Sequence, residues 1–168
     1  YEEVCSGATG HFEAVQVHYD PERVGYGELL DIFWRHIDPT DPGGQFYDRG
    51  PQYRTAVFYH DEEQKRGAEE SKRTLEESGR FDRPIATLIE PFTRFYEAED
   101  YHQDYYRTCS SDYARYRAGS GRDRFIEQKW GDLARMPVRG RQAGVEAGGA
   151  AGESEVSETK MKDGAMKD

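Results

Sequence analysis

The chain has 168 residues, with 35% hydrophobic and 13% aromatic residues, which is enough for one domain with a modest core and a tail. The formal net charge of -10 argues against a nucleic-acid-binding protein, because phosphate binding needs a basic face. No apolar run approaches the ~20 residues of a membrane span. No signal peptide is visible, and two cysteines are too few for a disulfide framework, so a cytoplasmic protein is expected.

The composition changes once, at Pro137. Residues 137–168 contain no aromatic residue and are rich in Gly, Ala, Ser, Glu and Lys. Such a segment cannot bury enough apolar surface to offset its ordering entropy. The sequence therefore predicts a folded domain over 1–136 and a disordered tail over 137–168. Because the chain begins with Tyr1 rather than Met, we expect it to be a fragment or a processed product.

Strand and helix signals alternate along the folded part. Residues 12–19 (Phe-Glu-Ala-Val-Gln-Val-His-Tyr) predict a strand. An apolar stripe at helical spacing then predicts a helix that ends before Asp38-Pro39. The stripe consists of Tyr26, Leu29, Leu30, Phe33 and Trp34. A loop rich in Gly, Pro and Asp follows over 39–52, and loops of this length inside a compact domain are often functional.

The second half of the folded part continues this alternation. A strand is predicted over 54–60, and Asp61 then caps a helix, with Gln64 completing a capping box and Gly79 ending it. The remaining predicted elements are a strand over 85–90 and short helices over 99–106 and 123–130. This pattern predicts an α+β fold in which a small mixed β-sheet packs with helices.

Several polar residues fit poorly with packing alone. Glu13 shares a strand face with Val15, Val17 and Tyr19, so it is either a strand-end residue that reaches water or a buried acid with a raised pKa.

Asp48 and Tyr53 close the long loop, where a turn aspartate and a core tyrosine are the alternative to a site. Tyrosines and acids gather over 96–106, where amphipathic packing and a binding cleft are both open. His102 has no second His or Cys at ligand spacing, so no metal site is expected.

Three blocks of the sequence resemble the peptide-methionine (S)-S-oxide reductase family. The first block is Tyr-Glu-Glu-Val-Cys-Ser-Gly over 1–7, followed by Thr9-Gly10-His11 and Glu13. The second is Asp-Arg-Gly-Pro-Gln-Tyr-Arg over 48–54. The third is Phe95-Tyr96 followed by Ala-Glu-Asp-Tyr-His-Gln-Asp-Tyr over 98–105. Their order and spacing make the signal specific, and the resemblance covers roughly residues 1–130.

The resemblance implies both a fold and an activity. The fold would be a two-layer sandwich of the peptide methionine sulfoxide reductase type. The activity would be reduction of the S epimer of methionine sulfoxide, free or in proteins, as repair of oxidative damage. A cysteine thiolate attacks the sulfoxide sulfur and becomes a sulfenic acid, a second thiol forms a disulfide with it, and thioredoxin or another thiol reductant restores the pair. No cofactor is expected.

The resemblance also implies roles for particular residues. Glu13 would be the proton donor to the leaving oxygen. Tyr1, Tyr53 and Tyr105 would hold that oxygen, and Asp48 would support them from the loop. An aromatic-walled pocket with few donors suits this small substrate.

The cysteines depart from the family pattern. The attacking cysteine of the family lies in a Gly-Cys-Phe-Trp motif before the first block, and this chain has no such motif. Cys5 stands in a Val-Cys-Ser-Gly setting that we expect to be buried and structural. Ser120 stands where one branch of the family has a resolving cysteine, so Cys109 is the remaining candidate for that role, or is merely a loop cysteine.

Two functional hypotheses follow. The chain is either part of a methionine sulfoxide reductase seen without its N-terminal piece, and is then inactive by itself, or a non-catalytic relative that binds methionine sulfoxide or a protein partner. The retained residues Glu13, Asp48, Tyr53 and Tyr105 favour the enzyme, because a binding protein has little use for a proton donor.

Overall fold

The computed structural model describes residues 10–135 and 161–163. The boundary predicted at 136 and the disorder predicted for 137–168 lie outside the described residues, except at β6 (Met161–Asp163). The backbone of β6 pairs in antiparallel register with β1 (Glu13–Val15), so that Glu13 stands opposite Asp163.

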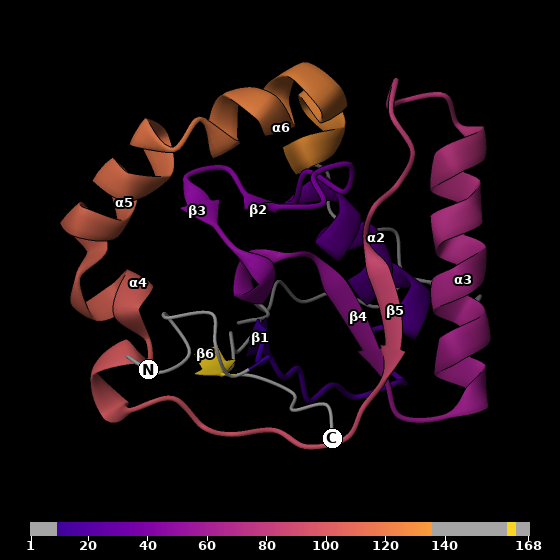
Figure 1. Cartoon of the computed structure of the whole chain (residues 1–168), viewed down its shortest axis with the longest axis horizontal. Coiled ribbons are helices and arrows are strands. Elements are labelled where there is room, and N and C mark those ends of the chain that lie inside the picture. The colour runs from indigo at the N-terminus through magenta and orange to yellow at the C-terminus, as the bar shows by residue number, and fades with distance from the viewer. Residues whose placement is uncertain (1–9, 136–160, 164–168) are drawn as a thin grey trace, which may run out of the picture.

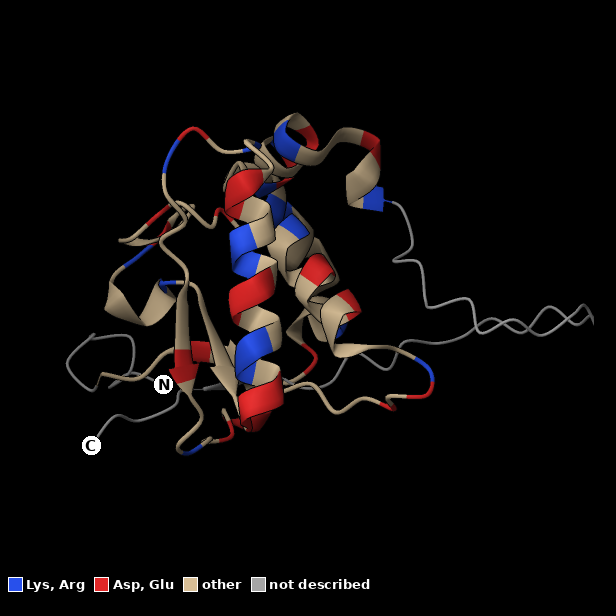
Figure 2. Ribbon diagram, turned by 90° about the vertical axis from the view of Figure 1, so that its right-hand side faces the viewer, with Lys and Arg blue, Asp and Glu red and all other residues tan. Residues whose placement is uncertain are grey.

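The centre of the fold is a β-α-β unit. The parallel strands β4 (Ala56–Tyr59) and β5 (Leu88–Pro91) pair with Ala56 opposite Leu88. Parallel strands cannot be joined by a tight turn. Here α3 (Glu62–Glu77) makes the crossover and lies alongside β5, as Figure 1 shows. The outer face of α3 carries alternating basic and acidic residues (Figure 2), which explains its polar sequence.

The ends of α3 follow local sequence signals. The Asp61 carboxylate accepts a hydrogen bond from the Gln64 backbone N–H at 2.8 Å, as predicted. The Gln64 side chain accepts from the N–H of His60 rather than that of Asp61, so the capping box is shifted by one residue on this side. Gly79 follows the helix with a φ of 64°, a conformation that glycine adopts without steric cost.

The hydrophobic core lies between α3, α2 (Tyr26–Arg35) and α6 (Arg122–Trp130). The apolar stripe predicted for 26–34 is confirmed as α2, and its Trp34 also donates a hydrogen bond to Ser71 Oγ at 2.6 Å. The buried residues of this core are Leu30, Trp34, Ile37, Ala68, Leu75, Ile85, Ile126 and Trp130.

The first predicted strand is shorter than expected. Of residues 12–19, only Glu13–Val15 form a strand, and Val15 and Val17 are 60% and 52% exposed. The apolar face on which Glu13 was placed is therefore not buried among the described residues. The physical reason is that β1 pairs with β6 and does not join β4 and β5, so the core helices do not cover it.

The segment after β5 is more helical than expected. The helix predicted over 99–106 is divided into the 3-10 turn η2 (Asp100–His102) and α4 (Tyr105–Thr108). A further helix, α5 (Ser110–Gly119), was not predicted. None of its ten residues, all within the described range, is buried, so it has no apolar stripe to reveal it. The helix predicted over 123–130 is confirmed as α6, and the turn η3 (Gly131–Arg135) follows it.

The predicted α+β class is confirmed, with helices packed against small sheets. In the described ranges, the strands form separate parallel and antiparallel pairs rather than one mixed sheet.

Candidate functional site

The long loop over 39–52 contains a β-hairpin that positions Asp48. Strands β2 (Gly44–Gln45) and β3 (Asp48–Arg49) pair through a two-residue turn. Phe46, the first turn residue, has a φ of 52°, a conformation that usually selects glycine in such turns. Its ring packs edge-on against Phe125 of α6, with centroids 5.6 Å apart. Packing against α6 thus holds a strained turn, and the turn sets the direction of β3.

Gly44 allows the two strands of this hairpin to approach. Its φ is 145°, and a Cβ built on it would lie 2.2 Å from the backbone oxygen of Asp48. Any other residue at position 44 would therefore displace the backbone that carries Asp48.

The next residue of β3, Arg49, forms an ion pair with Asp41. The hydrogen bonds from the Arg49 guanidinium hold the pKa of the Asp41 carboxyl below its usual value.

Asp48 meets side chains from distant parts of the chain. The Tyr116 hydroxyl of α5 donates a hydrogen bond to Asp48 Oδ2. The pKa of the Tyr116 hydroxyl is raised, mainly by burial and then by the hydrogen bond to Asp48 and the charge of Asp48. The negative charge of Glu13 raises it further. Arg122 opposes this effect. Asp48 and Arg122 thus both act on the Tyr116 hydroxyl, and Glu13 acts on it through its charge; we call these four residues the acid cluster.

Arg122 supplies the positive charge of the acid cluster. Its guanidinium donates to the backbone oxygen of His36 at 3.1 Å and lies 4.7 Å from the centroid of the Phe46 ring. Burial lowers its pKa, while the charges of Tyr116 and Asp48 act in the opposite direction. A guanidinium remains protonated at neutral pH. Arg122 therefore connects the strained turn at Phe46 with the charge of Asp48.

The other predicted site residues are not among the four residues of this cluster. Tyr53 is half-buried and ends the 3-10 turn η1 (Pro51–Tyr53), which packs against the hairpin. Tyr105 begins α4 and is 39% exposed. Tyr1 lies outside the described residues.

The cysteines are placed only in part. Cys5 lies outside the described residues. Cys109 is a free, half-buried cysteine between α4 and α5, and its backbone oxygen accepts from the Tyr113 N–H at 2.9 Å in the first turn of α5. Ser120 is buried after the end of α5, where its hydroxyl donates to the Arg117 backbone oxygen at 2.8 Å. The serine thus has a structural role in the junction between α5 and α6.

Comparison with known proteins gives the family. The family model described as peptide methionine sulfoxide reductase matches residues 1–134. The peptide methionine sulfoxide reductase MsrA of Bacillus licheniformis is 56% identical over 131 residues, which cover 78% of this chain and 72% of the relative. The chain belongs to the peptide methionine sulfoxide reductase family. The resemblance seen in the three sequence blocks is confirmed at this level.

Other members of the family agree. The MsrA of Bacillus velezensis is 54% identical over 132 residues, covering 79% of this chain and 75% of the relative. Among solved structures, reduced Mxr1 from Saccharomyces cerevisiae matches with a TM-score of 0.61 and 38% identity over 64% of this chain. Methionine sulfoxide reductase A of Corynebacterium diphtheriae matches with a TM-score of 0.54 and 33% identity, also over 64% of this chain. The chain spans 59% and 56% of these two structures.

Two members of the acid cluster of this reductase-family chain were not singled out from sequence. Tyr116 and Arg122 lie within four residues of Ser120, and neither was given a role from sequence. The available signal was a charged residue beside a Gly-Ser-Gly turn, which is weak. Only the hydrogen bond to Asp48 and the contact with Phe46 reveal their positions.

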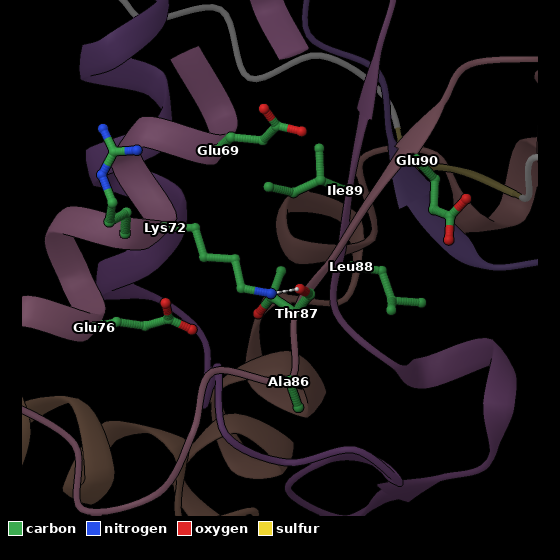
Figure 3. Close-up of a pocket in the computed structure, with 9 residues that line it drawn as sticks. Glu69, Lys72, Glu76, Ala86, Thr87, Leu88, Ile89 and Glu90 are labelled. Atoms are coloured by element: carbon green, nitrogen blue, oxygen red, sulfur yellow. Dashed lines mark hydrogen bonds between the residues drawn. The ribbon is translucent and has the colours of Figure 1, made fainter. Parts of the chain in front are cut away.

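A surface depression of about 450 Å³ lies elsewhere on the reductase fold, between α3 and β5. Figure 3 shows Lys72 reaching across its floor, where its ammonium donates to the Thr87 backbone oxygen at 2.9 Å. Figure 1 places α3 and β5 on the opposite side of the fold from α5 and β3. The depression shares no residue with the acid cluster, and the Lys72 ammonium within it is already hydrogen-bonded to the backbone.

Two further findings concern only the part of the chain that the structure describes. No group of three or more His, Cys, Asp or Glu side chains is arranged to hold a metal ion. No described helix has the length and apolar character needed to cross a membrane.

Proposed function

We propose that this chain carries the oxygen-binding and proton-donating half of a peptide-methionine (S)-S-oxide reductase site. One observation supports this proposal most directly. Asp48 accepts a hydrogen bond from the Tyr116 hydroxyl, and the charge of Glu13, assigned from a separate sequence block 35 positions earlier, helps to raise the pKa of the same hydroxyl. Two carboxylates beside a hydrogen-bond donor suit a reaction in which a sulfoxide oxygen must gain a proton before it leaves.

The proposed reaction converts methionine S-sulfoxide, free or in a protein, to methionine. A cysteine thiolate attacks the sulfoxide sulfur, the sulfur–oxygen bond breaks, and the cysteine becomes a sulfenic acid as the methionine sulfur is reduced. Glu13 donates the proton that the oxygen needs. Tyr1, Tyr53 and Tyr105 hold the oxygen, and Asp48 supports them. A second thiol then forms a disulfide and releases water, and a dithiol such as thioredoxin supplies two electrons to restore both thiols.

The attacking cysteine is the open point of this proposal. Neither cysteine of the printed sequence stands in a Gly-Cys-Phe-Trp motif. We therefore propose that the 168-residue chain binds the sulfoxide and does not reduce it. With so few cysteines, the reaction suits a reducing compartment such as the cytoplasm.

The test is a turnover assay on two proteins. The first is the 168-residue chain with dithiothreitol, for which no reduction of methionine S-sulfoxide above background is expected. The second is a chimera that places a segment with the family's Gly-Cys-Phe-Trp motif before Tyr1, for which turnover is expected, with a motif Cys→Ser variant as the control. Turnover by the first protein that disappears on Cys5→Ser would instead make Cys5 the nucleophile.

Cys109 is proposed as the resolving thiol. It lies seven residues before Tyr116, or about 10 Å along α5 at the helical rise, so α4 or α5 must move for it to meet a sulfenic acid near the acid cluster. In the chimera, mass spectrometry of the oxidised protein is expected to find a disulfide between Cys109 and the motif cysteine. A Cys109→Ser chimera that still turns over at the parental rate with thioredoxin would refute this role.

The alternative is a non-catalytic relative that binds methionine sulfoxide or a protein partner. A chimera that binds methionine S-sulfoxide but forms no methionine, even in a single turnover, would favour it.

A further inference from the structure

Helix α5 is attached to the fold by polar contacts rather than by the core. Although all of its residues are described, none is buried. Figure 1 shows α5 running past the tip of the β2–β3 hairpin. Tyr116 reaches Asp48 of that hairpin, and Arg117 pairs with Asp123 of α6 at 2.7 Å. The Tyr116 hydrogen bond is therefore a direct link between α5 and the proposed site.

We propose that Tyr116 is a positioning residue of the sulfoxide site, which orients the Asp48 carboxylate by donating its phenol hydrogen to Oδ2. This role rests on the proposed function and adds a residue to it. Donation to one carboxylate oxygen fixes the rotation of the Asp48 side chain and leaves Oδ1 for the groups that hold the substrate oxygen. Arg122 restrains the same carboxylate electrostatically from α6.

The chemistry of Tyr116 suits a fixed donor. Burial, the Asp48 hydrogen bond and the Asp48 charge raise its pKa above the usual range, and Glu13 adds to this effect. The phenol therefore keeps its proton throughout the neutral range. Tyr116 is 41% exposed, so the residue lies at the edge of the fold. A hydrogen bond to a charged acceptor is stronger than one between neutral groups.

The hydrogen bond itself can be tested without substrate. The 168-residue chain is labelled with ¹³C at tyrosine Cζ and followed by NMR. The Tyr116 resonance is assigned as the one that is absent from the spectrum of Tyr116→Phe. At about pH 10.5 exposed tyrosines are largely ionised, and Tyr116 is expected to remain neutral. In an Asp48→Ala variant it should ionise at lower pH. A Tyr116 titration that is the same in both proteins would refute the link to Asp48.

The positioning role is tested by binding of the two epimers of methionine sulfoxide. Tyr116→Phe is expected to weaken binding of the S epimer about three- to tenfold, and binding of the R epimer less. In the Asp48→Ala background the same change should have no further effect, because its partner is already absent. Tyr47→Phe is the matched control, since it removes a phenol hydroxyl one residue from Asp48 and should leave binding unchanged.

The outcomes separate this inference from the proposed function. If the parent chain does not bind the S epimer, the proposed function fails, and the role of Tyr116 fails with it, whatever the titration shows. If the parent chain binds the S epimer and Tyr116→Phe binds it equally well, only the positioning role fails. The same holds if Tyr116→Phe loses affinity equally for both epimers and its effect adds to that of Asp48→Ala. Selective, non-additive loss supports it.

Discussion

Gly44 gives the sharpest test of how the hairpin positions Asp48. In Gly44→Ala the new Cβ would lie 2.2 Å from the Asp48 backbone oxygen, with further contacts at 3.0 and 3.2 Å to the backbone of the same strand. A φ of 145° is also nearly closed to residues with a side chain. The backbone conformation alone costs about 1–3 kcal/mol, and the clash adds to it because neither neighbour is the end of a flexible side chain. We therefore expect the free energy of unfolding to fall by at least about 2 kcal/mol.

The measurement is urea unfolding of the 168-residue chain beside a matched control. Gly27→Ala changes the same residue type in α2, where nothing lies within 4 Å of the new Cβ and φ is not positive. Alanine has the higher helix propensity, so this control should be neutral or more stable by up to about 1 kcal/mol. Gly44→Ala should also weaken binding of methionine S-sulfoxide, because Asp48 moves. Equal stability of Gly44→Ala and the parent would refute the argument that close backbone approach requires glycine here.

Three further predictions concern single side chains. In the chimera with the Gly-Cys-Phe-Trp motif, Glu13→Gln should lower kcat about 10²–10⁴-fold with little change in substrate binding. Near-parental turnover of this variant from pH 6 to 9 would show that Glu13 is not the proton donor. Burial, followed by the charges of Tyr19 and Asp61, raises the pKa of Tyr26 to about 12. The free energy of unfolding should therefore fall as pH rises from about 10, the pKa in the unfolded chain, to about 12. Urea unfolding across this range should show a smaller fall for Tyr26→Phe. The buried Tyr26 hydroxyl has no hydrogen-bond partner among the described residues, so the same variant should lose no stability at pH 7. Trp34→Phe should lower the free energy of unfolding by about 1–3 kcal/mol, because it removes the hydrogen bond to Ser71 and leaves unfilled space in the core. A melting temperature equal to that of the parent would contradict this prediction.

Local patterns in the sequence were sufficient for the core of this protein. The stripe over 26–34 became α2, and Asp61 and Gly79 bound α3, because helix periodicity and capping depend on residues within a few positions of one another. The strands over 56–59 and 88–91 were also predicted, with ends displaced by one to three residues. The three sequence blocks identified the family and named Glu13 and Asp48 as site residues.

The acid cluster depended on tertiary structure. The ring of the turn residue Phe46 packs on Phe125 and Arg122 of α6, more than 75 positions later in the chain. Helix α5 has no apolar stripe and is joined to the rest of the fold by the Tyr116–Asp48 hydrogen bond and the Arg117–Asp123 ion pair. Single polar contacts between distant segments leave no periodic signal in a sequence. They form only when the chain closes around its core. The sequence therefore indicated the two carboxylates of the acid cluster but not its phenol and guanidinium.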